Sequence, residues 1–149
     1  MGIQMKRLLV LAASLVLVAC AQESSEGGPQ ARATPVDLAS AMANADSKAG
    51  ERMYPLCQSC HTLDEGGLNK IGPNLHGFYD SPAAQADGFF YSAALSDAGI
   101  TWDDETLDHW ITNPSTAVPG TTMIFAGISD QQQRADLIAY LRGATGEAP

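Results

Sequence analysis

The chain is organised around Cys57-Gln58-Ser59-Cys60-His61. The pattern Cys-x-x-Cys-His is the sequence signature for covalent attachment of a c-type haem. Two thiols at this spacing can each add to one of the two vinyl groups on one edge of a porphyrin, and the next residue is then held beneath the iron. We therefore predict that Cys57 and Cys60 bind the haem covalently and that His61 is an axial ligand of its iron.

Three other interpretations of the cysteine pair compete with haem attachment. Half of a zinc site would need two more Cys or His ligands at matching spacing, but the chain has no second Cys pair and its other histidines are His76 and His109. A thioredoxin-like redox pair would need a βαβ pattern around it, and none is visible. A structural disulfide is compatible with the two cysteines, but it gives the adjoining histidine no role.

Met123 is the only methionine that follows His61 in the chain, so it is the candidate for the second axial ligand. A single methionine is more often a gap-filling core residue, but its surroundings argue against that interpretation here. Residues 119–128 closely resemble the methionine loop of mitochondrial cytochrome c and its soluble bacterial relatives. The resemblance implies that Met123 and His61 bind the iron from opposite sides.

The resemblance to class I c-type cytochromes extends over residues 50–142. Further segments match the family in the same order: Gly72-Pro73-Asn74-Leu75-His76-Gly77, Gly99-Ile100-Thr101-Trp102, Glu105-Thr106-Leu107, Asn113-Pro114 and Arg134-Ala135-Asp136-Leu137-Ile138-Ala139-Tyr140-Leu141. This resemblance implies an all-α fold, the class I cytochrome c fold, with three to five helices around one covalently attached haem c.

The same resemblance implies roles for residues around the haem. The carbonyl of Pro73 is expected to accept a hydrogen bond from the other ring nitrogen of the axial histidine, which fixes the ring and strengthens its donation to the iron. Tyr91 and Trp102 match positions that hydrogen-bond a haem propionate, and Thr121 is expected in the second layer of residues around the haem. Ser81 takes the place of an arginine that is common near the propionate in mitochondrial proteins.

Local signals predict how the first helix begins and ends. Asp46 is a good N-cap, and Pro55 is expected to end the helix near Tyr54 or to kink it, because proline removes a hydrogen bond and clashes one turn back. Gly50 and Tyr54 lie four positions apart, on one face. By resemblance to the family, this face is expected to cross the C-terminal helix.

Two further helices are predicted near the C-terminus. The i, i+3, i+4 spacing of Leu107, Trp110 and Ile111 indicates the buried face of one helix. Ser129, followed three positions later by Gln132, predicts a capping box at the start of the last helix.

The N-terminus has a secretory pattern. Lys6 and Arg7 precede an apolar run over residues 8–19, which as a helix would measure about 18 Å and is too short for a hydrocarbon core of about 30 Å. Leu17-Val18-Ala19-Cys20 resembles a bacterial lipobox, in which the cysteine is lipidated and becomes the mature N-terminus. The alternative is a leader cleaved near Ala21. We favour lipidation, because the haem uses the other two cysteines and a stray thiol would be unusual in an exported protein.

These signals predict three regions: a lipoprotein-type signal peptide over residues 1–19, a flexible linker over residues 20–45 and a haem domain over residues 46–149. The protein is expected to be exported and to lie on the periplasmic side of a bacterial membrane, anchored by lipid.

The chain is acidic, with a formal net charge of -9 at pH 7. Removing residues 1–19 takes away Lys6 and Arg7 and no acidic residue, so the charge becomes -11. This charge argues against nucleic acid or an anionic membrane surface as an electrostatic partner. The stretch that matches the lysine-bearing haem edge of mitochondrial cytochrome c reads Pro114-Ser115-Thr116-Ala117-Val118-Pro119. The redox partner is therefore not expected to present a strongly acidic site.

The expected function is one-electron transfer in a bacterial respiratory or photosynthetic chain, by a membrane-tethered monomer that is not an enzyme. The resemblance implies a quinol–cytochrome c reductase as the donor and a terminal oxidase or another acceptor. Two alternatives stay open. The chain could be a haem subunit of a dehydrogenase or oxidase complex, or a haem peroxidase or ligand sensor in which Met123 is labile.

Overall fold

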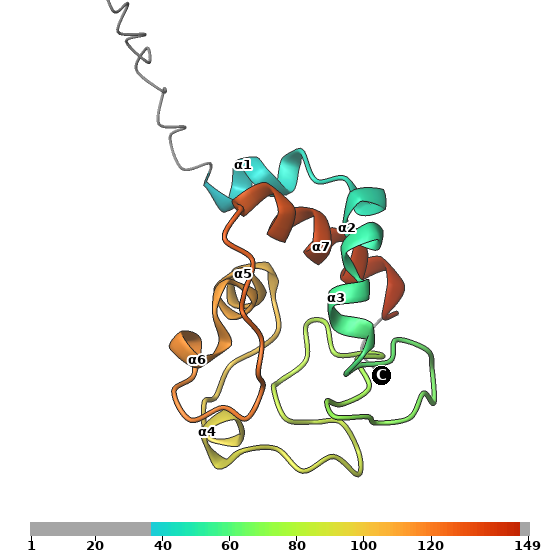
Figure 1. Ribbon diagram of the computed structural model, residues 1–149, viewed down its shortest axis with the longest axis vertical. Helices are drawn as coiled ribbons and strands as arrows, with labels where there is room; N and C mark the ends of the chain where they lie inside the picture. The colour runs from blue at the N-terminus through green and yellow to red at the C-terminus, as the bar shows by residue number, and fades with distance from the viewer. Residues whose placement is uncertain (1–36, 147–149) are drawn as a thin grey trace, which may run out of the picture. The chain divides into compact units, whose positions relative to one another are not determined.

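The computed structural model describes residues 37–146, so the predicted signal peptide and the lipidation of Cys20 lie outside the described residues. Within this range the fold is all-α, as predicted, and it has no strand, only an isolated β-bridge between Pro82 and Thr101 (Figure 1). The helices are α1 (Leu38–Ala43), α2 (Ser47–Met53), α3 (Pro55–Gln58), α4 (Ala93–Ser96), α5 (Asp104–Thr112), α6 (Pro114–Ala117) and α7 (Gln131–Ala144).

The described residues contain seven helical segments rather than the three to five expected. Three of the seven, α3, α4 and α6, are single turns of four residues. Between α3 and α5 the chain is loop apart from α4. None of the helices within residues 37–146 combines the length and the apolar character needed to cross a bilayer.

The start and end of α2 follow the local chemistry of the sequence. The side chain of Asp46 caps the helix by accepting a hydrogen bond from the backbone N–H of Lys48 at 2.9 Å. The helix ends at Met53, and Pro55 takes the first position of α3, where its missing N–H removes no helical hydrogen bond. The predicted break before Pro55 is confirmed.

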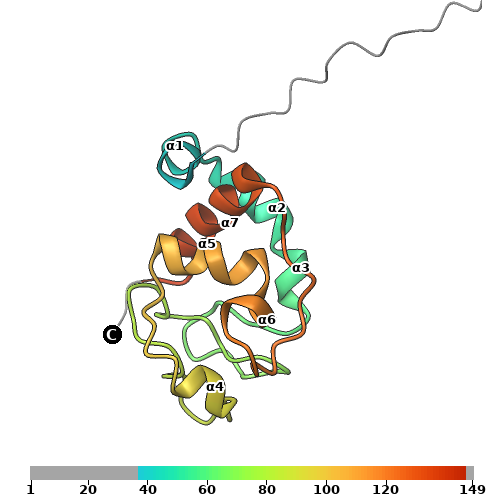
Figure 2. The same cartoon turned by 90° about the vertical axis from the view of Figure 1, so that its left-hand side faces the viewer.

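Helices α2 and α7 cross at Gly50, as predicted (Figures 1 and 2). A Cβ atom added to Gly50 would lie 2.0 Å from the backbone oxygen of Asp136, so the two helix backbones approach as closely as the absence of a side chain allows. The rings of Tyr54 and Tyr140 pack beside this crossing, with centroids 5.8 Å apart. The crossing packs α2 against the C-terminal helix, and α3 follows α2 directly in the chain.

The predicted capping box at the start of α7 is wrong. The N-cap is Asp130, whose carboxylate accepts a hydrogen bond from the backbone N–H of Gln133 at 2.9 Å. Gln132 instead donates to the backbone oxygen of Ala41 at 3.1 Å and to the carboxylate of Asp136 at 3.0 Å. The amide of Gln132 is therefore used to hold α1, a contact that local sequence does not reveal.

Part of the predicted linker is folded. Residues 38–43 form α1, which the side chain of Asp37 caps by accepting from the backbone N–H of Ser40 at 2.9 Å. Ala41 is completely buried where α1 packs against α7 (Figure 2). The small side chains of this helix let it lie close to α7, so residues 38–43 of the predicted linker are helical and packed.

The core lies between α5 and α7. Leu107, Trp110 and Ile111 point inward from α5, which confirms the predicted helical face. They pack with the buried residues of α7 and with Trp102, whose ring lies edge-on to that of Trp110 at a centroid distance of 5.3 Å. Cys57, Tyr91 and Met123, which are among the residues expected to contact the haem, pack against this core.

Candidate functional site

The haem-attachment motif lies at the end of α3 and in the turn that follows it. The backbone oxygen of Cys57 accepts hydrogen bonds from the backbone N–H groups of Cys60 and His61, both at 3.0 Å. Both cysteines are half-buried and neither forms a disulfide, and Cys57 packs against the core. The turn therefore presents two free thiols and the imidazole of His61 from five consecutive residues.

The ring of His61 is held by the segment that contains Pro73. Nδ1 of His61 lies 2.8 Å from the carbonyl oxygen of Pro73, which confirms the predicted contact. Because a carbonyl oxygen can only accept, Nδ1 carries the proton and Nε2 keeps its lone pair for a metal. Gly72 packs directly on the ring, since a Cβ atom there would lie 2.3 Å from Cε1 of His61. The ring is fixed in both its tautomer and its position.

Burial favours the neutral forms of His61 and Cys57. Burial lowers the pKa of His61, the hydrogen bond to Pro73 partly opposes this effect, and the nearby charge of Lys70 adds to it. Burial also raises the pKa of the Cys57 thiol to about 11, with a smaller contribution from Cys60. At neutral pH the imidazole is therefore the uncharged form that binds iron, and the unreacted Cys57 thiol stays protonated.

Met123 lies in the loop between α6 and α7. It is half-buried and packs against the same core as Cys57. The hydroxyl oxygen of Thr121 accepts a hydrogen bond from the backbone N–H of Met123 at 3.3 Å, and the backbone N–H of Thr121 donates to the oxygen of Val118 at 3.0 Å. Thr121 therefore supports the backbone at Met123, and its place in the second layer of residues around the haem stays a prediction.

Tyr91 and Trp102, which are expected near a haem propionate, each carry a hydrogen-bond donor. The hydroxyl oxygen of Tyr91 accepts from the backbone N–H of Ala86 at 3.1 Å, so its own proton is free to donate. Trp102 is almost completely buried, and its indole carries an N–H donor. Ser81 uses its hydroxyl to donate to the oxygen of Phe78 at 2.5 Å. The propionate contacts of Tyr91 and Trp102 stay predictions.

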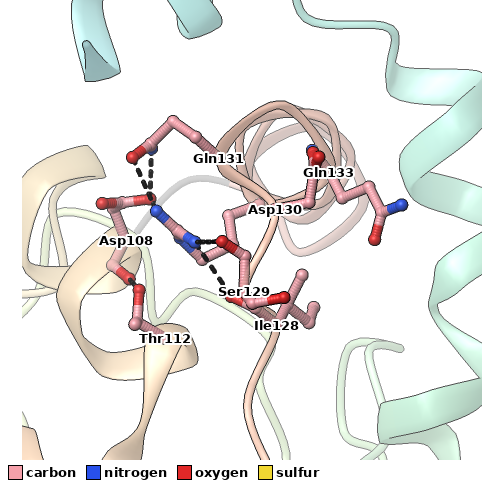
Figure 3. Close-up of polar contacts among 8 residues, drawn as sticks. Asp108, Thr112, Ile128, Ser129, Asp130, Gln131 and Gln133 are labelled. Carbon is pink, nitrogen blue, oxygen red and sulfur yellow. Dashed lines mark hydrogen bonds and ion pairs between the residues drawn. The ribbon is translucent and has the colours of Figure 1, made fainter. Parts of the chain in front are cut away.

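Two polar contacts of the site were not foreseen from the sequence. The ammonium of Lys70 donates to the backbone oxygen of Gln58 at 2.6 Å, at the end of α3. The guanidinium of Arg134 forms an ion pair with Asp108 at 2.7 Å, next to Ile128 and Ser129 (Figure 3). Neither pair has a sequence signal, because the partners lie 12 and 26 positions apart on different elements.

These residues fit a covalently attached haem c. Two free thiols, an imidazole with an available Nε2 and a thioether are the groups that such a haem binds through its vinyl groups and its iron. A zinc site fits less well, because the described residues contain no cluster of three or more His, Cys, Asp or Glu side chains that could hold a metal ion.

Comparisons with known proteins agree with this chemistry. The family model for cytochrome c matches residues 47–145. Cytochrome c2 of Blastochloris viridis is 41% identical over 97 residues, which are 65% of this chain and 76% of that protein. Cytochrome c of Theileria parva is 44% identical over 103 residues, which are 68% of this chain and 89% of that protein. The solved structure of cytochrome cH from Methylobacterium extorquens superposes with a TM-score of 0.61 at 42% identity, covering 65% of this chain and 97% of that one.

The all-α fold and the Cys57–His61 motif define a class I c-type cytochrome. The chain belongs to the cytochrome c family, and its cofactor is one covalently attached haem c. Helix α1 precedes the region that the family model matches.

Proposed function

We propose that this protein is a one-electron carrier in which His61 and Met123 bind the haem iron from its two sides. The bound haem supplies the Fe(II)/Fe(III) couple. The observation that carries the proposal is the 2.8 Å contact between Nδ1 of His61 and the carbonyl of Pro73, which leaves the lone pair of Nε2 available to a metal. The electron-carrier role also agrees with the family to which the chain belongs.

The contribution of the protein to electron transfer is to hold the two proposed iron ligands, His61 and Met123, in fixed positions. Pro73 and Gly72 fix the ring of His61, and Thr121 supports the backbone at Met123. A thioether ligand and a buried site favour the reduced state and raise the reduction potential. If both ligands stay in place in the two oxidation states, little reorganisation accompanies electron transfer.

An enzymatic alternative would need an open iron and a distal acid–base residue. The candidates are His76 and His109, and both are exposed. His76 lies against the C-terminal end of the described chain, where its Cε1 atom is 3.0 Å from a Cβ built on Gly146, and His109 lies on the outer face of α5. These positions favour a carrier over a peroxidase or a ligand sensor.

The holoprotein is therefore expected to give a reversible one-electron potentiometric titration and no turnover of hydrogen peroxide with a reducing dye. The physical reason is that Met123 occupies the position at which peroxide would bind. Rapid peroxide-dependent oxidation of the dye by freshly purified protein would contradict the proposal. Protein partly unfolded in urea, in which the methionine is released, is the positive control for peroxide turnover.

The surface near Met123 supports a partner that is not strongly acidic. Ser115, Thr116 and Thr122 are exposed where the mitochondrial proteins carry lysines, and Ile124 is fully exposed. The ammonium of Lys70 is held by the backbone oxygen of Gln58. We propose a quinol–cytochrome c reductase as the donor and a terminal oxidase or another redox protein as the acceptor, with contacts that are largely uncharged.

A lipid on Cys20 would bring the haem domain to its redox partners without the electrostatic attraction that lysines provide in the mitochondrial proteins. Anchoring on the periplasmic side of the membrane raises the concentration of the haem domain near membrane-bound partners, and this effect does not depend on salt. The role of Cys20 as the lipidated residue is inferred from the Leu17-Val18-Ala19-Cys20 pattern.

Replacing Cys20 with serine is expected to release the holoprotein from the membrane and to slow its reduction in dilute membrane suspensions.

Reduction of the wild-type protein by the membranes is expected to change little between low and high salt, because the docking surface carries few charges. The measurement is the rate of haem reduction after addition of quinol, at several salt concentrations. A Cys20→Ser protein that stays in the membrane fraction, or a wild-type rate that falls steeply with salt, would contradict this part of the proposal.

A further inference from the structure

A partly buried polar cluster lies where the loop carrying Met123 joins α7 (Figure 3). Its members are Asp108 on α5 and Gln131 and Arg134 on α7, and Arg134 is only 6% exposed. The proposed electron transfer uses none of these side chains directly. A guanidinium at this depth needs a structural or functional reason, because burying a charge is costly unless it is paired and hydrogen-bonded.

The three side chains form a closed ring of hydrogen bonds. Nε of Arg134 donates to Oδ1 of Asp108 at 2.7 Å, and Nη2 donates to Oε1 of Gln131 at 2.6 Å. The amide nitrogen of Gln131 donates to the same oxygen of Asp108 at 2.7 Å. The ring leaves Nη1 of Arg134 pointing in one fixed direction.

Nη1 is directed at the backbone of the methionine loop. It donates to the carbonyl oxygens of Ile128 and Ser129, both at 2.9 Å (Figure 3). The backbone N–H of Ile128 in turn donates to the oxygen of Ile111 on α5 at 2.9 Å. The end of the loop is therefore attached to both helices, and the Arg134–Asp108 pair joins these helices to each other.

Between this point and the methionine, packing rather than backbone hydrogen bonding holds the loop. Gly127 lies against the backbone of α5, since a Cβ atom there would be 2.0 Å from the oxygen of Thr112, and Phe125 packs against the core. Residues 122–127 form no backbone–backbone hydrogen bond within the described chain. On the other side of Met123, Thr121 provides the nearest anchor. The Arg134 cluster therefore supplies side-chain hydrogen bonds to the loop on the C-terminal side of Met123, and Thr121 supplies one on the N-terminal side.

We propose that Asp108 is a positioning residue that, through Arg134, keeps Met123 on the iron. The inference rests on the proposed ligation by Met123. Without the carboxylate, the buried guanidinium loses its counter-charge and turns toward water, and the carbonyls of Ile128 and Ser129 lose their donor. The end of the loop is then free to move, and the thioether leaves the iron more often.

The test is the rate at which imidazole replaces the methionine in the ferric holoprotein. At saturating imidazole this rate equals the rate at which the thioether leaves, which can be followed by the loss of the near-infrared methionine-to-iron band. Asp108→Ala is expected to raise this limiting rate about tenfold or more, as the loss of a charge-assisted hydrogen bond implies.

A matched control is available on the same two helices. Asp104 on α5 forms an ion pair with Arg142 on α7 and also accepts a hydrogen bond from the hydroxyl of Tyr79, so its polar partners differ from those of Asp108. Asp104→Ala is expected to leave the limiting rate within about twofold, as is usual for an exposed ion pair. An increase as large as that of Asp108→Ala would show that general loosening of α5 and α7 explains the effect, and would overturn the proposal.

A second variant separates positioning from stability. Asp108→Leu combined with Arg134→Met replaces the buried pair by apolar side chains, a change that often preserves folding stability. It still removes the donor to Ile128 and Ser129, so its limiting rate is expected to be raised although its unfolding midpoint in urea is close to that of the wild type. A wild-type limiting rate in this variant would overturn the proposal. A wild-type protein without the near-infrared band would instead refute the underlying ligation by Met123.

Discussion

Replacing Met123 with alanine is expected to lower the midpoint reduction potential by on the order of 0.1–0.3 V, within the range of about 0.8 V that axial ligands control. The thioether stabilises the reduced iron, and its loss leaves a position that water or an added ligand can take. Because Met123 is only half-buried and lies in a loop with few hydrogen bonds of its own, alanine is expected to leave the helices intact.

The measurement is a spectroelectrochemical titration of the two proteins in the same buffer. Met42→Ala is the matched control, since Met42 is also a half-buried methionine but lies on α1, packed against the core. This control is expected to keep the wild-type potential. A Met123→Ala protein that has the wild-type potential and a low-spin spectrum would show that another group binds the iron.

Replacing Gly50 with alanine is expected to have the largest effect on folding. The new Cβ would lie 2.0 Å from the backbone oxygen of Asp136 and 2.8 Å from the Cβ of Tyr140, so α2 and α7 must separate. We expect the free energy of unfolding to fall by about 3 kcal/mol, at the upper end for an overpacked site. The measurement is urea unfolding of the holoprotein followed by far-ultraviolet circular dichroism.

The matched control for this substitution is Gly143 on α7. A Cβ there meets no atom within 4 Å, so Gly143→Ala is expected to raise the free energy of unfolding by about 0.5–1 kcal/mol through the better helix propensity of alanine. Equal stabilities of the two alanine variants would mean that α2 and α7 do not cross closely at Gly50 in solution.

Features with a local chemical cause could be predicted from the sequence. The cap at Asp46 and the break before Pro55 depend on one side chain and the backbone next to it, and both are confirmed. The contact between His61 and Pro73 joins segments 12 positions apart, yet it was predictable because the haem motif and the family resemblance place the two together. The family and the cofactor followed from the same motif.

Features that depend on distant partners could not be predicted. Ser129 and Asp130 are adjacent candidates for the N-cap of α7, and Asp130 takes this role while Gln132 is engaged by α1. Helix α1 is short and weakly amphipathic, and its stability comes from packing on α7, which its own sequence does not specify. The pairing of Arg134 with Asp108 likewise exists only after α5 and α7 have packed together.

The central claim is that His61 and Met123 together close both axial positions of the iron. The most direct test is the optical spectrum of the purified ferric holoprotein, including the weak near-infrared methionine-to-iron charge-transfer band, before and after addition of imidazole. The structure leads us to expect a low-spin spectrum with this band, which changes only slowly when imidazole is added. A high-spin spectrum, or immediate binding of imidazole, would contradict the claim and would favour a peroxidase or a ligand sensor.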